Sequence, residues 1–248
     1  MAGAAPRSAA DKTLVVLEAL AEHSRVADIA KSTDLPKPTV HRILQTLVRH
    51  GFARTDGQGE YSGGPRILSL AGRFLQRLDI AEQVRPILRD LQEQTGWTVH
   101  LALLSGDEAV YVAKIEGARP YTLASRVGMS LRLHCTSIGK AILATLPDDE
   151  VRALVRRAGM PARTEHTHTD ENTLLDDLAG VRRRGYAEDH EENEAGVRAV
   201  GAAIFDHTGD VLGAVSAAAL VYQEEPVGGR GDLVMRAAAA VSRALGAH

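Results

Sequence analysis

The stretch LPKPTVHRILQTLVRHGFA, residues 35–53, decides the fold of the first part of this chain. Its apolar residues recur at the three- and four-residue spacing of a helix with one buried face. Two prolines stand at the start, where a helix tolerates them because the first backbone N–H groups have no partner inside the helix. His50 and Gly51 form a stop. The pattern predicts a helix over 38–49 whose buried stripe is Val40, Ile43, Leu44, Leu47 and Val48.

The opposite face of this predicted helix is polar and basic. Its side chains are of the types that contact phosphates and base edges in DNA complexes. We expect a DNA-reading face made of Lys37, Thr39, His41, Arg42 and Gln45.

The neighbouring sequence supports this reading. Apolar periodicity predicts helices over 11–22 and 26–32, and TDLPK is a turn. Short strands are expected at 52–55 and 60–62, joined by DGQG, which favours a hairpin. This order is the plan of a winged helix-turn-helix, whose second helix enters the major groove. Arg54 and Gln58 would then lie on a wing at the DNA. The alternative is a plain three-helix subdomain with a solvated polar face.

Composition narrows the class of protein. The 248 residues are 44% hydrophobic and 25% charged, the balance of a soluble globular protein. A single cysteine, Cys135, excludes a disulfide framework within the chain. The first residues lack the apolar run of a signal peptide, and no stretch approaches about 18 uninterrupted apolar residues. We therefore expect a cytoplasmic protein with no membrane span.

Charge is unevenly spread along the chain. Residues 1–66 hold nine Lys and Arg against seven Asp and Glu, a net of +2, and the rest hold 20 against 25, a net of −5. A basic N-terminal part followed by an acidic remainder is typical of a chain whose N-terminal part binds a polyanion. Ordinary scatter of surface charge explains so small an excess equally well.

The remainder of the chain alternates strand and helix signals. We expect a linker helix over 66–78, helices over 80–94, 137–146, 150–157, 172–184 and 231–245, and strands at 98–104, 108–116, 121–128, 131–134, 185–192, 197–206 and 211–220. Helices mixed with one antiparallel sheet make an α+β domain. The predicted organisation is a DNA-binding domain over 8–64, a linker helix over 65–79 and a second domain over 80–248.

Three motifs resemble one family. VADIAKSTDLPKPTVHRILQTLVRHGFARTDGQGEYSGGPRILSLA is similar to the winged helix-turn-helix of IclR-type bacterial transcriptional regulators. LRLHCTSIGKAILATLP and RRGYAEDHEENEAGVRAVGAAIFDHTGDVLGAVSAAA resemble the GAF-like effector-binding domain of that family. The resemblance implies a repressor or activator, a homodimer or dimer of dimers, whose affinity for double-stranded operator DNA a small metabolite changes. It implies no enzyme and no cofactor.

The resemblance also places an effector site. Ser137 and Ile138 would offer backbone N–H groups, and Asp189 would face the ligand from a strand. The remaining lining residues would be Leu131, Leu133, Val197, Ala199, Ser216 and Ala218. Members of the family often carry Cys at the position of Ala199 and Ser at that of Ala218. The substitutions favour a ring-bearing or alkyl acid as effector, unless these small residues only satisfy strand packing.

Four other groups of residues carry side chains of chemically active types. Glu165, His166, His168 and Asp170 are metal-ligand types, but they fall in one polar loop, and metal sites draw ligands from several elements. We expect no metal there. In DHEENE, residues 189–194, all but Asp189 are expected in a solvated turn.

Ser137-x-x-Lys140 has the spacing of some acyl-transfer enzymes but lacks their companion motifs, so Lys140 is assigned to a solvated helix face. His134 and Cys135 are neighbours, which on a strand point to opposite faces, so no catalytic pair is expected. Two alternatives to a DNA-binding regulator stay open. The second domain could be a hydrolase or deaminase, or it could sense a metabolite and signal through a head that binds protein.

Overall fold

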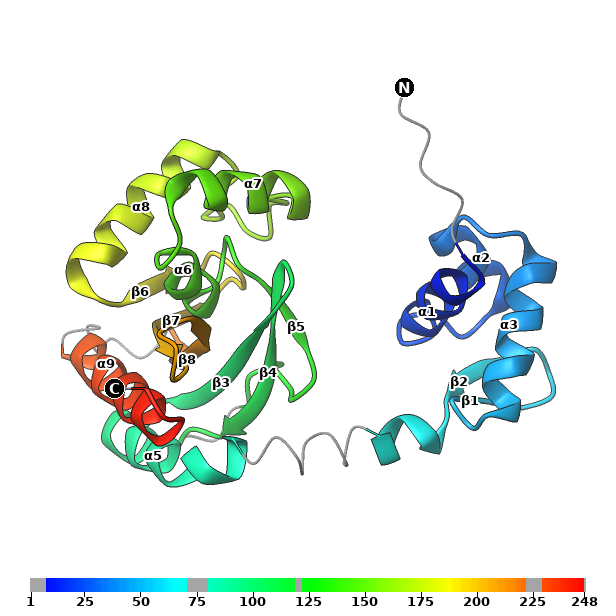
Figure 1. Cartoon of the computed structure of the whole chain (residues 1–248), viewed down its shortest axis with the longest axis horizontal. Coiled ribbons are helices and arrows are strands. Elements are labelled where there is room, and N and C mark those ends of the chain that lie inside the picture. The colour runs from blue at the N-terminus through cyan, green and yellow to red at the C-terminus, as the bar shows by residue number, and fades with distance from the viewer. Residues whose placement is uncertain (1–7, 71–79, 119–121, 222–228, 248) are drawn as a thin grey trace. The chain divides into compact units, whose positions relative to one another are not determined.

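A computed structural model describes residues 8–70, 80–118, 122–221 and 229–247. The chain divides into two compact units, Met1–Leu78 and Asp79–His248, which are described separately. The first unit contains helices α1 (Ala9–Ala19), α2 (Val26–Thr33) and α3 (Lys37–Arg49), followed by the hairpin β1 (Ala53–Thr55) and β2 (Tyr61–Gly63) (Figure 1). This is the predicted winged helix-turn-helix, and its element boundaries differ from the predicted ones by at most three residues.

Local sequence sets these boundaries. The Ser8 hydroxyl accepts the N–H of Asp11, and the Asp11 carboxylate accepts the N–H of Ser8, so a capping box begins α1. Asp34 ends α2 in the left-handed conformation at φ 54°. Pro36 then precedes α3 as its cap. The three helices and the hairpin bury a common core of Val16, Leu20, Ile29, Ala30, Val40, Ile43, Leu44, Leu47, Ala53 and Tyr61.

The second unit is one antiparallel sheet of six strands with helices on both faces. The strands are β3 (Thr98–Ser105), β4 (Glu108–Ile115), β5 (Ser130–Arg132), β6 (Ala187–His190), β7 (Val197–Phe205) and β8 (Val211–Leu220), in the order β5-β4-β3-β8-β7-β6. The helices are α5 (Ile80–Thr95), α6 (Ser137–Leu143), α7 (Asp148–Ala158), α8 (Glu171–Arg184) and α9 (Arg230–Ala244). This is the expected α+β fold.

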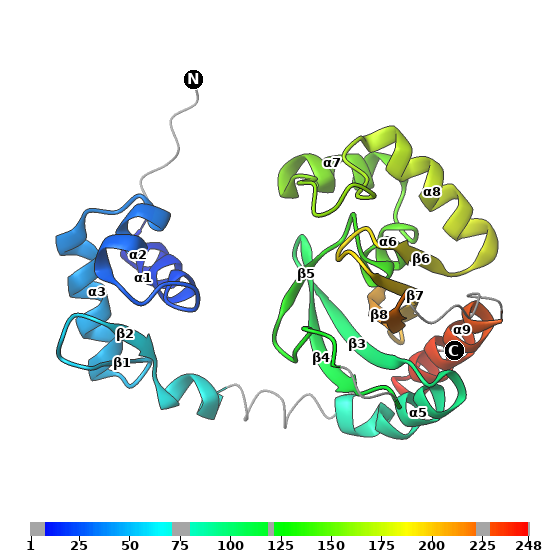
Figure 2. The same cartoon turned by 180° about the vertical axis from the view of Figure 1, so that it is seen from behind.

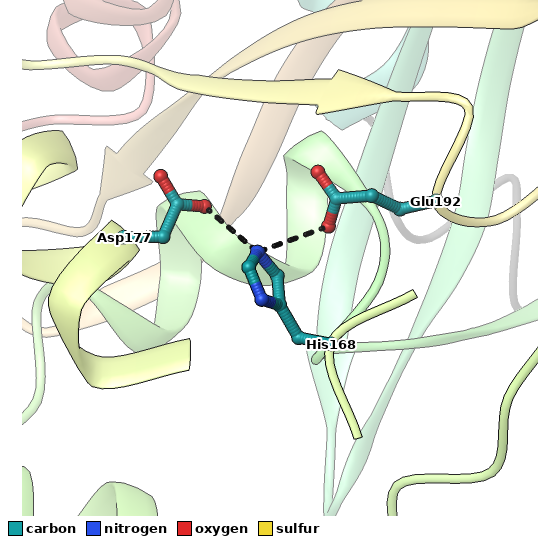
Figure 3. Close-up of side chains that lie close together, drawn as sticks. All are labelled: His168, Asp177 and Glu192. Carbon is teal, nitrogen blue, oxygen red and sulfur yellow. Dashed lines mark ion pairs between the residues drawn. The ribbon is translucent and has the colours of Figure 1, made fainter. Parts of the chain in front are cut away.

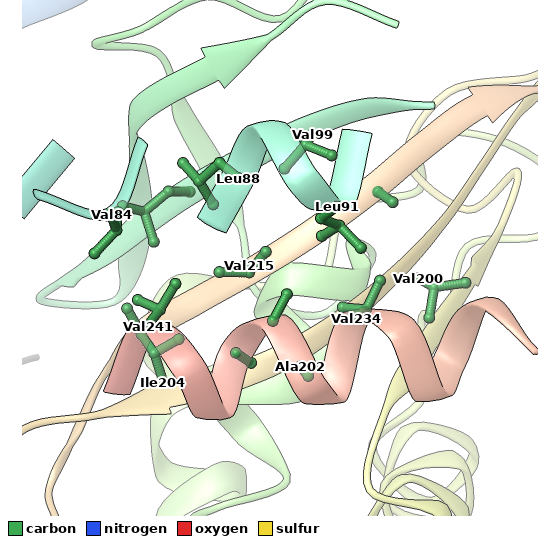
Figure 4. Close-up of a cluster of buried hydrophobic side chains, with 14 of the residues drawn as sticks. Val84, Leu88, Leu91, Val99, Val200, Ala202, Ile204, Val215, Val234 and Val241 are labelled. Carbon is green, nitrogen blue, oxygen red and sulfur yellow. The ribbon is translucent and has the colours of Figure 1, made fainter. Parts of the chain in front are cut away.

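Two hydrophobic cores lie on the two faces of this sheet. Helices α5 and α9 cover one face, and α6, α7 and α8 lie over the other (Figure 2). Figure 4 shows the first core, in which Val84, Leu88 and Leu91 of α5 meet the strands and α9. Alternate strand residues supply the two cores, as the two-residue period of a strand requires. Val99 and Leu101 belong to the first core, whereas Ala102 belongs to the second.

Helix α6 lies unusually close to its neighbours because two glycines leave room for it. A Cβ on Gly139 would stand 2.2 Å from the Cα of Leu133, and one on Gly201 would stand 2.7 Å from the carbonyl oxygen of Ser137. Every residue of α6 is buried, and the Thr136 hydroxyl caps the helix by accepting the Gly139 N–H. These two glycines therefore allow the start of α6 to pack directly against the backbone of the sheet and of Leu133.

The structure corrects one strand. The predicted strand over 121–128 is irregular at 122–128, and Tyr121 lies outside the described residues. The predicted linker helix is helical at 65–70, while residues 71–78 of that prediction also lie outside them. Within the described residues, the helices are too short or too polar to cross a membrane.

Candidate functional site

The polar face of α3 lies open to solvent, as a DNA-reading face requires. Lys37, His41, Arg42 and Gln45 are exposed, and Thr39 is half-buried. Arg54 and Gln58 are exposed on the hairpin. Gln45 is also tied to the wing, because its side-chain amide donates to the Tyr61 hydroxyl at 3.0 Å.

The structure adds two basic residues to this face. Thr39 and Arg42 line a shallow hollow together with Lys12 of α1 and Arg49 at the end of α3. Lys12 was not predicted because it belongs to another helix, 27 residues before Thr39 in the chain. An ion pair from Arg25, just before α2, to Glu60 at 3.1 Å joins the hairpin to the start of α2.

A cavity of about 400 Å³ opens on the α6 side of the sheet in the second unit. We call it the cavity from here on. Its floor is formed by residues of neighbouring strands that pair with one another across the sheet. Asp189 pairs with Ala199, and Ala199 with Ala218, while Ser216 pairs with both Gly201 and His100. The start of α6 and residues 123–125 and 129–132 form its walls.

Eight of the nine predicted effector residues line this cavity, namely Leu131, Ser137, Ile138, Asp189, Val197, Ala199, Ser216 and Ala218. Leu133 is not among the lining residues. It lies 2% exposed in the core beneath α6 and α7. Strand β5 ends at Arg132, so Leu133 lies beyond the strand that carries Leu131.

Several lining residues were not predicted, chiefly His100, Tyr111, Leu123, Ser125, Arg163 and Asn193. His100 is 2% exposed, and its Nε2 lies 2.8 Å from the Ser125 hydroxyl. Its ring lies 4.7 Å from that of Tyr111, centre to centre. A polar residue in the apolar strand TVHLALL was the available signal for His100. Residues 123–125 are held over the cavity by Lys114, whose ammonium donates to the carbonyls of Leu123 and Ser125 at 2.9 Å.

Burial controls the charges in the cavity. Burial and the nearby Lys114 ammonium lower the pKa of His100 to about 3, so this imidazole is neutral. Burial raises the pKa of Asp189 to about 7, although the N–H of Glu192 donates to its carboxylate at 2.8 Å. Burial and the Asp189 carboxylate raise the pKa of Tyr111 to about 12. Among the buried groups of the lining, a neutral imidazole and a neutral phenol thus stand with a carboxyl whose pKa lies near 7.

The apolar part of the lining is small and smooth. Leu123, Val197, Ala199 and Ala218 form a buried cluster of their own. The polar groups stand on either side of it. His100 belongs to β3, Tyr111 to β4 and Ser216 to β8, whereas Asp189 belongs to β6 and Ser137 to α6.

Of the metal-ligand types in the 165–170 loop, Glu165 and His166 lie 3.8 Å apart, while His168 belongs to a different group. Among the described residues, the group that could hold a metal is His168 with Asp177 and Glu192, whose nearest ligand atoms lie within 4.8 Å of one another (Figure 3). The Lys140 ammonium already occupies this cluster, because it donates to Asp177 at 2.6 Å and to Glu192 at 2.5 Å.

This cluster overturns two predictions. Lys140 was assigned to a solvated helix face, but it is 1% exposed. Glu192 was assigned to a solvated turn, but it is 4% exposed. A buried lysine is stable when carboxylates pair with it, and here the partners lie 37 and 52 residues away in the chain. His134 contacts the Pro161 carbonyl, and the Cys135 thiol contacts Asn193, so the two side chains have different partners.

Comparisons with known proteins agree with this architecture. The family described as "Bacterial transcriptional regulator IclR C-terminal" matches residues 72–243, and "IclR helix-turn-helix domain" matches residues 9–57. The HTH-type transcriptional regulator XynR of Escherichia coli is 33% identical over 242 residues, which cover 95% of this chain and 96% of that protein. The transcriptional repressor IclR of Escherichia coli is 33% identical over 241 residues, 94% of this chain and 88% of that one.

Solved structures show the same fold. A putative IclR transcriptional regulator from Silicibacter sp. TM1040 superposes with a TM-score of 0.83 at 28% identity, over 97% of both chains. An IclR homolog of Microbacterium hydrocarbonoxydans, complexed with 4-hydroxybenzoate, has a TM-score of 0.78 at 25% identity, over 96% of this chain and 99% of that one. The matched families and these relatives are transcriptional regulators and not enzymes.

Proposed function

We propose here how this chain acts, given that it belongs to the IclR family of bacterial transcriptional regulators. Members of this family are DNA-binding proteins with a C-terminal effector domain. The chain acts in the cytoplasm as a homodimer or dimer of dimers on double-stranded operator DNA. Helix α3 enters the major groove, and the hairpin contacts the DNA beside it. The contacting residues are Lys37, Thr39, His41, Arg42, Gln45, Arg54 and Gln58. Six of these seven residues are exposed, and residues 1–66, which contain all seven, carry a net charge of +2, which supports this assignment.

Exposed apolar residues on the first unit support pairing with a second copy. Leu14 of α1 is 57% exposed, and Leu68 of the helical segment 65–70 is 76% exposed. Large apolar side chains so open to water are stabilised when a partner covers them. Each dimer would then present two copies of α3 at a fixed spacing, which a palindromic operator matches.

The effector is a small organic acid, and an aromatic acid fits best. The cavity volume of about 400 Å³ lies in the range of small-ligand sites. A flat apolar body would lie against Leu123, Val197, Ala199 and Ala218, with hydrogen-bonding groups on either side. Ala199 and Ala218 lack the polar groups common at these positions in the family, which favours a ring over a small oxoacid. The 4-hydroxybenzoate bound to the Microbacterium homolog is a ligand of this class.

The carboxylate of such an acid would be held by the N–H groups of Ser137 and Ile138 and by Arg163. Arg163 lines the cavity from the 160–168 loop, and its side chain is exposed to solvent. Asp189 would face the ligand in its protonated form and donate a hydrogen bond, because a second carboxylate in the same cavity disfavours its ionisation.

Effector binding would act through a shift between conformations. The ligand binds one conformation of the second unit better than the other, and the linker passes the difference to the spacing of the two α3 helices. Coupling free energies of this kind are about 1–3 kcal/mol, or roughly 5- to 150-fold in operator affinity.

The observation that carries the proposal is that the exposed basic face of α3 and the cavity lie in separate units of one chain. Fluorescence anisotropy with DNA from upstream of the gene, at two salt concentrations and against scrambled DNA, tests it. We expect selective binding that weakens with salt, because phosphate contacts release counterions. Benzoate, 4-hydroxybenzoate and aliphatic acids are then added to the complex. DNA binding that depends on neither the salt concentration nor the DNA sequence would instead favour the alternative, in which the first unit binds a protein.

A further inference from the structure

A cluster of charged side chains around the buried Lys140 ammonium takes no part in lining the cavity. The Lys140 ammonium, on α6, donates to Oδ2 of Asp177 and to Oε1 of Glu192. His168 lies at the outer side of the cluster, with Nε2 at 3.8 Å from Oδ2 of Asp177 and from Oε2 of Glu192 (Figure 3). The described residues around the cavity do not include these four.

Glu192 connects three segments that do line the cavity. Its N–H donates to Oδ1 of Asp189 at 2.8 Å, at the end of β6. Its carbonyl accepts the Thr167 hydroxyl at 2.6 Å, and the same hydroxyl accepts the N–H of Arg163 at 2.9 Å. Its carboxylate accepts from Lys140, one helical turn beyond Ser137.

The ion pair between Lys140 and Glu192 is costly to break, because both groups are buried. A carboxylate that is 5% exposed is costly to bury without a partner, and removing one member of a buried ion pair leaves the other charge uncompensated. The turn at 191–196 therefore loses its partner on α6 if Lys140 loses its charge. Asn193 and Glu194 of this turn face the cavity.

We infer that the Lys140–Glu192 ion pair is a positioning pair, which holds the 191–196 turn against α6 and so fixes the polar wall of the cavity. As an account of effector binding it rests on the proposed function. Lys140 and Glu192 act through Asp189, Arg163, Asn193 and Ser137 without contacting the ligand. Substitution of either residue loosens the cavity before the domain unfolds.

The chain contains its own reporter of this loosening. Cys135 is the single cysteine and is buried, and its thiol lies 3.9 Å from Oδ1 of Asn193. Movement of the 191–196 turn away from α6 exposes this thiol. The labelling rate of the thiol by 5,5′-dithiobis(2-nitrobenzoate) in the full-length protein therefore measures the opening.

The experiment compares Lys140→Met and Glu192→Gln with wild type over a urea series. Both substitutions keep the size of the side chain. We expect labelling at least about tenfold faster than wild type without urea, with a shallow urea dependence, because a local opening exposes little surface. Lys140→Arg restores the charge and should recover most of the protection.

Val181→Ala is the matched control, because Val181 is buried on α8 in the core next to α6 and carries no charge. It should speed labelling only as far as its loss of global stability requires, with the steep urea dependence of complete unfolding. The inference is overturned if Lys140→Met labels as its global stability predicts, or if wild type itself labels quickly through a shallow opening. Operator binding by effector-free wild type tests the proposed function separately and does not enter the labelling result.

Discussion

Asp189 is 5% exposed, and burial raises the pKa of its carboxyl group to about 7, above the ordinary value of 3.8. The folded protein therefore holds this proton more tightly than the unfolded chain does. The resulting stability is fully present below about pH 4 and is lost as pH rises through 7, by up to about 1.4 kcal/mol per pH unit.

Asp189→Asn removes the ionisation and keeps an oxygen for the Glu192 N–H. We expect the variant to gain stability over wild type as pH rises from 4 to 7, and to hold that gain above pH 7. Thermal melting of both proteins between pH 4.5 and 8.5 checks this. Parallel curves would mean that Asp189 titrates normally in the fold.

Arg42 is the exposed arginine nearest the middle of the polar face of α3. Arg42→Ala should weaken operator binding by about 1–3 kcal/mol if the guanidinium reads a base, and equally on operator and scrambled DNA if it contacts phosphate. Anisotropy titrations with the two DNAs separate these cases. Arg163→Ala, an exposed arginine of the second unit, is the control and should leave effector-free binding unchanged. Wild-type affinity in Arg42→Ala would show that α3 is wrongly placed at the DNA.

At the scale of elements, the position of α6 depends on Gly139. An added Cβ would meet the backbone of Leu133 at 2.2 Å from Cα and 2.3 Å from the carbonyl oxygen, and backbone cannot move aside as a side chain can. Gly139→Ala should cost about 1–3 kcal/mol or more in the free energy of unfolding. Urea titration measures this cost.

Gly180 of α8 is the control for that substitution. A Cβ there would approach only the ends of two arginine side chains, that of Arg184 at 3.0 Å and that of Arg183 at 3.8 Å. Alanine is favoured over glycine inside a helix by about 1 kcal/mol, so Gly180→Ala should be neutral or stabilising. An equal loss of unfolding free energy in both variants would contradict the close packing of α6 against Leu133.

Helices and strands could be predicted where the pattern that specifies them lies within a few neighbouring residues of the sequence. The apolar period of residues 40–48 and the DGQG turn were enough to place α3 and the hairpin. The family resemblance assigned Asp189, Ala199 and Ser216 to one site, and the pairing of β6, β7 and β8 brings all three to the cavity. Lys140 was misplaced because a lysine on a helix is ordinarily solvated, and its two carboxylates come from distant segments that no local pattern joins to it. His100 was missed for a similar reason, because Ser125 and Tyr111 reach it only through tertiary packing.

At the scale of the whole molecule, each unit has its own hydrophobic core. The core of the first unit contains residues from 16 to 61, and the cores of the second contain residues from 84 to 241. Stability is therefore expected to be separable between the units. In a chain built this way, the linker is the covalent route by which an effector bound in the second unit can alter DNA binding by the first.

Two buried core residues allow this separation to be tested. Ile29 is 0% exposed in the first unit, and Leu178 is 0% exposed in the second. Substitution of either by alanine should cost about 2–5 kcal/mol in its own unit, a large share of the stability of a small domain. Ile29→Ala should then reduce operator binding and leave the labelling of Cys135 unchanged, whereas Leu178→Ala should speed labelling. Faster Cys135 labelling in Ile29→Ala would mean that the two units unfold together, and the effector signal would then have to pass through more than the linker.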